Sequence, residues 1–468
     1  MSTFTYDCDA DGVVTLSWDQ PGTTMNVLTR EGFKDFETLF DKAMADDAVK
    51  GVVITSAKKD FAGGMDLNVL ASIREEAGEN PAAGLFNFTM DGHRILRKIE
   101  RNGMDPKTHK GGKPVAWAGT GICAGIGTEI ALSCHRRFMA AGRGRIGLPE
   151  ILVGLFPGAG GTTRVVRMLG VMGAAPILLE GKMLAPEKAA SAGLIDEAVP
   201  ADELLSRAKA WVLSATDKDI VKPWDVKGYK MPGGTPYHPA GFMTFVGSAA
   251  MVHGKTQGVY PAAKAMLSAI YEGAMVDFET AIRIEARWFT SVLMNPSSSA
   301  MIRSLFLSKT ALEKGAVRPA VADQSVRKVG ILGAGMMGAG IATVSAGAGI
   351  EVVLIDREQE AADKGRAHVE AFLDEGVKRR KTTPEQKAET LARVTATTDY
   401  AALDTADLVV EAVFEDPAIK AAVTGQAEAA LPETAIFATN TSTLPITELA
   451  KASARSERFI GIHFFSPV

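Results

Sequence analysis

Between Val13 and Val199, short runs rich in β-branched residues alternate with stretches in which apolar positions recur every three or four residues. The runs at residues 51–56 and 114–117 have the composition of buried strands, and the stretches between such runs have the period of amphipathic helices. Glycine-rich turns, each able to bring backbone amides close to a ligand, lie at residues 62–65, 119–127 and 157–161. This alternation predicts an α/β architecture for the first part of the chain.

The pattern becomes helical after Pro200. A section rich in proline and glycine, residues 223–239, indicates a surface loop, and helical periodicity resumes in segments that start at Pro261, Asp277 and Ser297. A polar segment then precedes a new strand, so we expect a domain boundary near residue 323. The expected parts are residues 1–205, a helical extension and linker over 206–323, and a second α/β domain over 324–468.

A glycine-rich turn follows a short apolar strand near the start of the third part. The strand covers residues 328–332, and Gly333, Gly335 and Gly338 follow it in the spacing G-x-G-x-x-G before a helix of small residues that runs to Ala348. In this context the first glycine permits a tight turn, the second clears a pyrophosphate, and the third lets helix and strand pack closely. The sequence therefore predicts a dinucleotide-binding βαβ unit.

The next strand, residues 351–355, ends in Asp356, at the distance from the first glycine expected of a residue that binds ribose hydroxyls. Arg357 could favour a 2′-phosphate, but the carboxylate before it repels that group. We therefore expect NAD as the cofactor rather than NADP. Further along, residues 407–416 have the pattern of a buried strand with acids at its carboxyl end, and Lys420 is placed to reach a phosphate or a ribose.

Composition excludes several classes of function. The 468 residues are 46% hydrophobic and carry a formal net charge of −4, so we expect no nucleic-acid partner. Residues 329–350 lack charges, but their many glycines favour a turn and a helix over a membrane span. The three cysteines have no metal-ligand or disulfide spacing and the amino terminus has no targeting signal, which predicts a cytoplasmic protein without a metal site.

Four ordered segments of the third part resemble L-3-hydroxyacyl-CoA dehydrogenases. They are the glycine turn from residue 333, Val-Glu-Ala-Val-Phe-Glu-Asp at 410–416, Thr-Asn-Thr-Ser-Thr at 439–443, and Gly-Ile-His-Phe-Phe-Ser-Pro at 461–467. Although His463 alone also fits a core histidine at a strand end, the resemblance implies that it is the general base for the hydroxyl proton. Ser442 would hydrogen-bond the substrate oxygen. The residues assigned to NAD are Gly333, Gly335, Met337, Gly338, Asp356, Val413, Glu415, Lys420 and Ser442.

Two features depart from this dehydrogenase pattern. Relatives usually have asparagine where this chain has Ser466, and the chain stops at Val468. Because the last strand is apolar and needs cover on its edge and faces, we expect a truncated chain. The glutamate that orients the histidine and a closing helical domain would then lie beyond residue 468, and the dehydrogenase activity would be impaired.

The first part resembles the crotonase superfamily, and among its members the enoyl-CoA hydratases. The matching segments are Asp-Phe-Ala-Gly-Gly-Met-Asp-Leu at 60–67, Gly-Ile-Cys-Ala-Gly-Ile-Gly-Thr-Glu at 121–129, and Arg-Ile-Gly-Leu-Pro-Glu at 145–150 followed by the turn at 157–161. The resemblance implies a crotonase-like (ββα) fold, an acid–base pair of Glu129 and Glu150, and an oxyanion hole made by the amides of Met65 and Ile126. Either acid alone also fits a structural role, but the presence of both favours a hydratase over an isomerase or a dehalogenase.

The whole order, a crotonase-like domain, a helical linker and a Rossmann-type NAD-binding domain, resembles the alpha-subunit family of the bacterial fatty-acid β-oxidation multienzyme complex. The resemblance implies a bifunctional enzyme that hydrates trans-2-enoyl-CoA and then oxidises L-3-hydroxyacyl-CoA with NAD. It also implies acyl-CoA thioester substrates, a 3-ketoacyl-CoA thiolase subunit as partner, and an oligomer. The alternative is a CoA-binding scaffold that recruits a thiolase while one or both sites are inactive.

Overall fold

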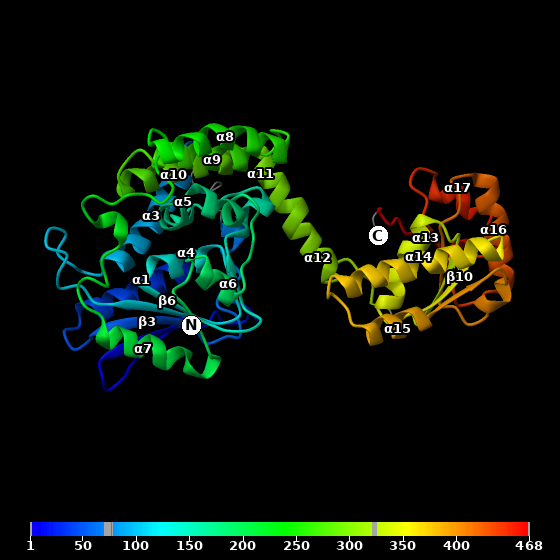
Figure 1. Ribbon diagram of the computed structural model, residues 1–468, viewed down its shortest axis with the longest axis horizontal. Coiled ribbons are helices and arrows are strands. Elements are labelled where there is room, and N and C mark those ends of the chain that lie inside the picture. The colour runs from blue at the N-terminus through cyan, green and yellow to red at the C-terminus, as the bar shows by residue number, and fades with distance from the viewer. Residues whose placement is uncertain (1, 70–75, 77, 321–324, 467–468) are drawn as a thin grey trace. The chain divides into compact units, whose positions relative to one another are not determined.

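The computed structural model describes residues 2–69, 76, 78–320 and 325–466. The chain falls into two compact units, Met1–Arg318 and Pro319–Val468 (Figure 1). The division lies a few residues before the boundary expected near 323. Within the described ranges, no helix has both the length and the apolar character needed to cross a membrane.

Unit 1 is built on a six-stranded sheet with the order β1-β2-β3-β4-β6-β8. Its strands are β1 (Phe4–Cys8), β2 (Val13–Trp18), β3 (Gly51–Ser56), β4 (Val115–Gly119), β6 (Arg136–Ala140) and β8 (Glu197–Val199). Only β1 runs antiparallel to its neighbour, and the other pairs are parallel. A second, two-stranded sheet joins β5 (Ile122–Ala124) to β7 (Arg145–Gly147). The strands expected at 51–56 and 114–117 are thus β3 and β4, and most of their residues are buried.

Helices cover both faces of this sheet, and short helical turns join them. They are α1 (Arg30–Ala45), α3 (Pro81–Arg101), α4 (Ile126–Ser133), η1 (Pro149–Val153), α5 (Gly161–Leu178), α6 (Pro186–Ser191), η2 (Ala201–Glu203), α7 (Leu204–Ser214) and η3 (Pro223–Asp225). On one face, Leu204, Ala208 and Val212 of α7 pack against a cluster that includes Val53 and Ala116. The boundary expected at residue 205 therefore falls inside a helix of unit 1.

The helical extension also packs into unit 1. It contains α8 (Pro239–Thr256), α9 (Pro261–Gly273), α10 (Phe278–Met294), α11 (Pro296–Met301), η4 (Ile302–Ser308) and α12 (Lys309–Glu313). Helix α10 lies against α3, α5 and α9, and Figure 1 shows α8, α9 and α10 side by side. Helix α8 is not anticipated by the sequence pattern, because Phe242, Met243 and Val246 remain exposed and blur the apolar period.

Unit 2 contains a parallel six-stranded sheet with the order β11-β10-β9-β12-β13-β14. Its strands are β9 (Lys328–Leu332), β10 (Glu351–Ile355), β11 (Val394–Thr397), β12 (Leu408–Glu411), β13 (Ile436–Thr439) and β14 (Phe459–Gly461). Numbered from the first strand of the unit, the order is 3-2-1-4-5-6, that of the dinucleotide-binding fold. The expected strands at 328–332 and 351–355 are β9 and β10.

Helices cover both faces of the second sheet as well, which explains why its strands are apolar along their whole length. They are α13 (Met336–Gly347), α14 (Gln359–Lys378), α15 (Pro384–Ala392), η5 (Tyr400–Leu403), α16 (Pro417–Ala430), α17 (Ile446–Ala450) and η6 (Ser456–Arg458). Alternate residues of β10 pack on opposite faces, with Val352 and Leu354 in the cluster that contains α13, and Val353 and Ile355 in the cluster that contains Ala427 of α16.

Two strands of unit 2 are shorter than their apolar runs. The run 407–416 forms a strand only over β12, because the Glu411 side chain accepts a hydrogen bond from the Val413 N–H at 2.8 Å and turns the chain. Phe414 is then 82% exposed. The run 459–465 forms a strand only over β14, at the edge of the sheet.

Candidate active sites

Unit 1 contains a cavity of about 1090 Å³ that brings the predicted hydratase residues together. Glu129, Glu150, Met65 and Ile126 all line it. Glu129 lies in the first turn of α4 and Glu150 in η1, so both acids project from the starts of helical segments. Apolar side chains supply most of the remaining wall, among them Phe33, Leu67, Phe88, Leu152, Leu155, Phe156, Phe289, Leu305 and Phe306.

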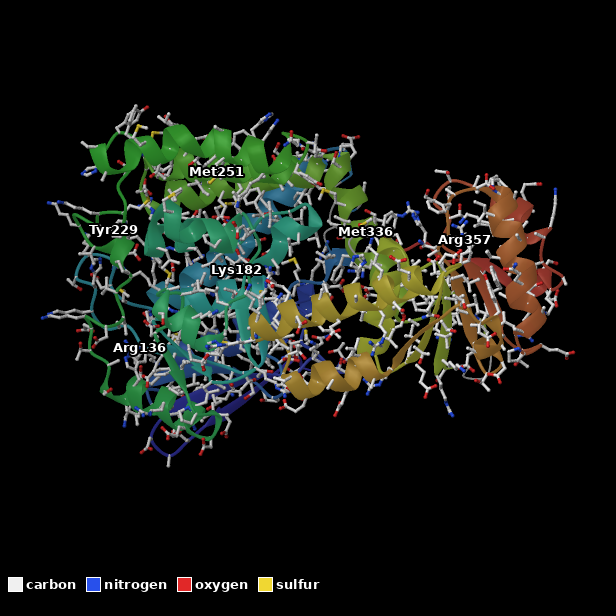
Figure 2. The ribbon with its side chains drawn as sticks, turned by 45° about the vertical axis from the view of Figure 1, so that its right-hand side comes forward. Arg136, Lys182, Tyr229, Met251, Met336 and Arg357 are labelled. Atoms are coloured by element: carbon white, nitrogen blue, oxygen red, sulfur yellow. The ribbon has the colours of Figure 1, made fainter. Side chains whose placement is uncertain are left out.

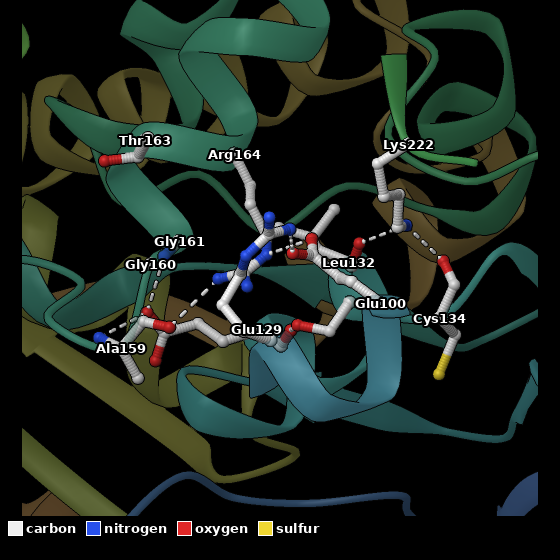
Figure 3. Close-up of polar contacts among 12 residues, drawn as sticks. Glu100, Glu129, Leu132, Cys134, Ala159, Gly160, Gly161, Thr163, Arg164 and Lys222 are labelled. Carbon is white, nitrogen blue, oxygen red and sulfur yellow. Dashed lines mark hydrogen bonds and ion pairs between the residues drawn. The ribbon is translucent and has the colours of Figure 1, made fainter. Parts of the chain in front are cut away.

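Glu129 is buried and held by the turn that precedes α5. Its Oε1 accepts hydrogen bonds from the amides of Ala159 and Gly161, both at 2.8 Å (Figure 3). Within the described residues Oε2 accepts none, and the side chain borders the cavity. Burial raises the pKa of Glu129, while the two amides and the Arg164 charge oppose that rise. The two amides and the Arg164 guanidinium are thus the groups that stabilise a negative charge on Glu129.

The surroundings of Glu150 stabilise a negative charge less than those of Glu129 do. Its Oε2 is buried without a hydrogen-bond partner among the described residues. Burial, together with the charges of Glu129 and Glu285, raises the pKa of Glu150 well above its usual value. The two acids thus differ in surroundings, because two amides and a guanidinium favour a charge on Glu129, whereas the charges of neighbouring carboxylates disfavour one on Glu150. A Cβ on Gly125 would lie 3.2 Å from Glu150 Oε1, so this glycine lets the carboxyl group reach the turn that leads into α4.

Two backbone amides at the cavity wall are free to bind a ligand. Met65 follows Gly64, whose φ is +118°, and Ile126 is the first residue of α4. Over the described part of the chain neither N–H donates a hydrogen bond. Free amides of this kind, one of them at a helix N-terminus, are the groups that stabilise an oxyanion.

A third buried acid, Glu285 of α10, was not predicted. It is fully buried, and its carboxylate accepts hydrogen bonds from the Gly160 amide at 2.6 Å and from the Thr163 amide at 2.8 Å. The sequence does contain a signal for it, since residues 278, 281, 282 and 286 form an apolar stripe in which 285 is the charged position.

A chain of buried charges supports the turn before α5 from the other side (Figure 3). Arg164 Nε donates to Glu100 at 2.8 Å, and its Nη1 donates to the Ala159 carbonyl at 3.1 Å. Although burial alone would raise the pKa of Glu100, the charges of Arg164, Arg97 and Lys222 lower it to about 2. Glu100 is therefore ionised, and the guanidinium stays fixed beside the turn.

The glycine turn of unit 2 has the geometry that a dinucleotide needs. A Cβ on Gly338 would lie 1.8 Å from the Gly333 carbonyl oxygen, so no other residue fits there. A Cβ on Gly335 would meet nothing within 4 Å, which leaves the backbone open toward solvent. Helix α13 starts at the next residue, and no side chain caps its first amides. The turn therefore fits a pyrophosphate, with Met337 in the first helical turn.

Asp356 lies where β10 ends. Its Oδ2 accepts from the Ala334 amide and its Oδ1 from the Arg357 amide, both at 2.7 Å, so the carboxylate is fixed beside the glycine turn. The Arg357 side chain is 91% exposed, and Met336 of α13 is also exposed (Figure 2). The Arg357 guanidinium pairs with Glu358 at 3.6 Å, and among the described residues no ion pair joins it to Asp356, so the carboxylate keeps the charge that repels a 2′-phosphate.

Glu415 joins two of the dehydrogenase motifs. It accepts hydrogen bonds from Thr441 Oγ1 at 2.6 Å, from the Ser442 amide at 2.9 Å and from Ser442 Oγ at 3.3 Å. Partial burial would raise the pKa of Glu415, but these bonds and Lys420 lower it to about 2. Lys420 is itself buried and pairs with Glu411 at 2.9 Å and Glu415 at 3.3 Å, so in this structure its ammonium is bound to protein carboxylates. Val413 is tied to Glu411 at the end of β12.

His463 is exposed at the end of the same sheet. The Ile462 amide donates to the Thr439 carbonyl at 3.0 Å, and the Phe464 amide donates to Asn440 Oδ1 at 2.7 Å. These two bonds anchor the backbone of His463 on both sides to the segment that also contains Ser442. The imidazole makes no hydrogen bond with any described residue, and its ring lies 4.5 Å from that of Phe465. Across the described residues, no cluster of metal-ligating side chains is found.

Comparison with known proteins assigns each unit to a family. Residues 9–222 match the enoyl-CoA hydratase/isomerase family, and residues 328–468 match the NAD-binding domain of 3-hydroxyacyl-CoA dehydrogenases. The fatty acid oxidation complex subunit alpha of Shewanella halifaxensis is 36% identical over 470 residues, and that of Shewanella amazonensis is 34% identical over 474. Both alignments cover 100% of this chain and 64% of the relative, so the chain spans about two thirds of their length at most.

The comparison with solved structures finds sequence similarity over part of the chain. The (S)-3-hydroxybutyryl-CoA dehydrogenase of Ralstonia eutropha is 44% identical over 31% of this chain and 51% of its own, with a TM-score of 0.30. On the two family matches and the alignment with the Shewanella proteins, the chain belongs to the enoyl-CoA hydratase/isomerase family over residues 9–222 and to the NAD-binding 3-hydroxyacyl-CoA dehydrogenase family over residues 328–468, and it is a homologue of fatty acid oxidation complex alpha subunits.

Proposed function

We propose that unit 1 hydrates trans-2-enoyl-CoA to L-3-hydroxyacyl-CoA. The observation that carries the proposal is the pair of carboxyl groups that line one cavity in different surroundings. Glu129 has two amide donors and a nearby guanidinium, whereas Glu150 has a buried oxygen with no partner among the described residues. A hydratase needs one ionised and one protonated acid, and these surroundings favour that division.

In the proposed reaction Glu129 Oε2 accepts a proton from water as the water oxygen bonds to C3 of the enoyl group. The C2–C3 double bond becomes a single bond, and Glu150 delivers its proton to C2. Glu129 then returns its extra proton to solvent and Glu150 takes one up, which restores the starting state. Each acid carries out one of the two proton transfers, so loss of either acid stops the cycle.

The amides of Met65 and Ile126 would hold the thioester oxygen. That oxygen gains negative charge when water attacks C3, and both N–H groups lack other acceptors in the described chain. Donors that are already aligned avoid reorganisation when the charge forms. Because the contact uses backbone atoms, the large side chains at these two positions leave it intact and shape the pocket instead.

We further propose that unit 2 takes part in oxidation of the L-3-hydroxyacyl-CoA product to 3-ketoacyl-CoA. NAD, when bound, supplies the hydride acceptor. Gly335 and the first turn of α13 would hold the pyrophosphate, and Asp356 the ribose hydroxyls. His463 would remove the hydroxyl proton and Ser442 would orient the substrate oxygen, consistent with the backbone bonds that join their two segments.

The proposed partners follow from the relatives. Their name describes subunits of a complex, and we propose that this chain binds a 3-ketoacyl-CoA thiolase subunit and works as an oligomer. The free thiols of Cys8, Cys123 and Cys134 support a reducing compartment such as the cytoplasm.

The test is hydration of crotonyl-CoA, followed by the loss of the conjugated enoyl-thioester absorbance. The proposal requires turnover by the parent chain and its loss in Glu129→Gln and in Glu150→Gln, with Glu187→Gln on the exposed side of α6 as a matched control. A parent chain that binds acyl-CoA without turnover would favour the alternative, a CoA-binding scaffold for a thiolase.

A further inference from the structure

The turn before α5 is held by two carboxylates from separate parts of the chain. Glu129 takes the amides of Ala159 and Gly161, and Glu285 takes the amide of Gly160 between them. Glu285 also binds both the amide and the hydroxyl of Thr163 in the first turn of α5. Consecutive amides of one turn therefore point alternately to the hydratase site and to the helical extension.

This division of amides depends on the shape of the turn. Gly160 has φ +98°, and a Cβ there would lie 1.9 Å from Arg164 Nη1. The left-handed residue sends the Gly160 N–H away from the neighbouring amides and toward α10. If Glu285 did not accept it, a buried donor would be left unpaired, and the turn would rotate to satisfy it at the expense of the Ala159 and Gly161 amides.

We propose that Glu285 on α10 is a positioning residue of the hydratase site, which fixes the 159–163 turn so that Glu129 presents Oε2 to the cavity. This inference rests on the hydratase function proposed above. It assigns to the helical extension a part in the hydration chemistry, in addition to the packing of its helix α10 against α3 and α5.

The charges around Glu285 give the proposal a pH signature. Burial and the charge of Glu129 raise the pKa of Glu285 to about 8, against the hydrogen bonds from Thr163 and Gly160. The ionised form of Glu285 in turn raises the pKa of Glu150. Above pH 8, the negative charge on Glu285 thus helps Glu150 to keep its proton.

Other ionisable groups near this turn and on the packed helices do not duplicate that effect. His93 of α3 is fully buried, and burial lowers its pKa to about 3, so it is neutral. Arg164 of α5 is bound to Glu100. From α9, Glu272 is bound to Arg287 and Trp288, Tyr271 interacts with Tyr237, and Lys264 Nζ lies beside Gly258.

The experiment compares hydration of crotonyl-CoA by Glu285→Gln and by the parent chain between pH 6 and pH 10. Steps of ~1 pH unit resolve the pKa shifts that neighbouring charges typically cause. In Glu285→Gln the amide oxygen can still accept from Gly160, but an NH₂ group stands where Oε2 accepts from the Thr163 amide and hydroxyl. The turn should therefore shift at Thr163, and we expect kcat to fall roughly 10- to 100-fold, since small misplacement of a reacting group costs that much, while KM stays within about twofold. The alkaline limb of the kcat profile should move to lower pH, because the amide carries no charge that would help Glu150 to keep its proton.

Two further variants keep the test decisive. Thr163→Val removes one donor to Glu285 and should lower kcat in the same direction but less, and it also decides the case if Glu285→Gln fails to fold. Glu279→Gln is the matched control on α10, where the acid is half-exposed, pairs with the half-exposed Arg101 and the buried Arg97, and makes no hydrogen bond to the 159–163 turn among the described residues. It should retain the parent kcat and pH profile.

The outcomes separate this inference from the function on which it rests. An active parent chain whose Glu285→Gln and Thr163→Val variants keep its kcat and alkaline limb would overturn the role of Glu285 alone. Equal losses in Glu285→Gln and Glu279→Gln would likewise reduce Glu285 to a residue of general packing. A folded parent chain without hydration would overturn the proposed function, and this inference with it.

Discussion

Glu129 should show that one carboxylate serves catalysis and folding through different oxygens. In Glu129→Gln the amide oxygen can still accept from Ala159 and Gly161, and the NH₂ group takes the place of Oε2 at the cavity. Folding should therefore change little. Hydration should fall by ~10²–10⁴-fold, the usual cost of losing a general base, which is about 3–5 kcal/mol of barrier.

Glu129→Ala should lose as much activity as Glu129→Gln, and unlike Glu129→Gln it should also lose stability. It leaves two buried amides without an acceptor, at about 1–3 kcal/mol each, so the free energy of unfolding should fall by about 2–6 kcal/mol. All five tryptophans, at positions 18, 117, 211, 224 and 288, lie in unit 1, so their fluorescence during urea unfolding reports on that unit.

The two variants thus separate the roles of Oε1 and Oε2. Alanine and glutamine variants of equal stability would refute the role given to the 159–161 amides. Full hydration by Glu129→Gln would remove Glu129 from the acid–base pair. Acyl-CoA binding, measured by calorimetry, should survive in the glutamine variant.

Three further predictions concern unit 2. Asp356→Ala should weaken NAD binding and reduce the preference over NADP, measured by calorimetric titration with both cofactors. Equal affinities of the parent chain for both cofactors would contradict the assignment. Lys420→Met should leave the buried Glu411 carboxylate without its ion-pair partner and lower the free energy of unfolding by about 3–5 kcal/mol, measured by circular-dichroism melts. In the same melts Lys451→Met, which breaks an exposed pair with Glu448, should change the free energy of unfolding little. Because His463 is exposed and has no acid partner among the described residues, this chain should bind NAD yet form NADH from 3-hydroxybutyryl-CoA up to ~10⁴-fold more slowly than the (S)-3-hydroxybutyryl-CoA dehydrogenase of Ralstonia eutropha. Equal rates would show that the imidazole needs no such partner.

The sequence by itself was sufficient for features whose parts are neighbours along the chain. The strand at 328–332, the glycine turn and Asp356 are read from one continuous segment, because a βαβ unit forms from consecutive residues. The same holds for β3 and for the order of the two domains, which the family matches confirm. Strand ends were less well predicted, since a side-chain bond such as that from Val413 to Glu411 stops a ladder in an apolar run.

Only the tertiary structure brings Glu285 close enough to Glu129 and Glu150 for their charges to influence one another. Glu285 is more than a hundred residues from the other two, and along the sequence it is a single acid within an apolar helical stripe. Its role appears when α10 packs on α5 and places the carboxylate at the amides of Gly160 and Thr163. The shifts in the pKa of Glu129 and of Glu150 also depend on burial and on charges from distant segments, because electrostatic interactions act through space and not along the chain.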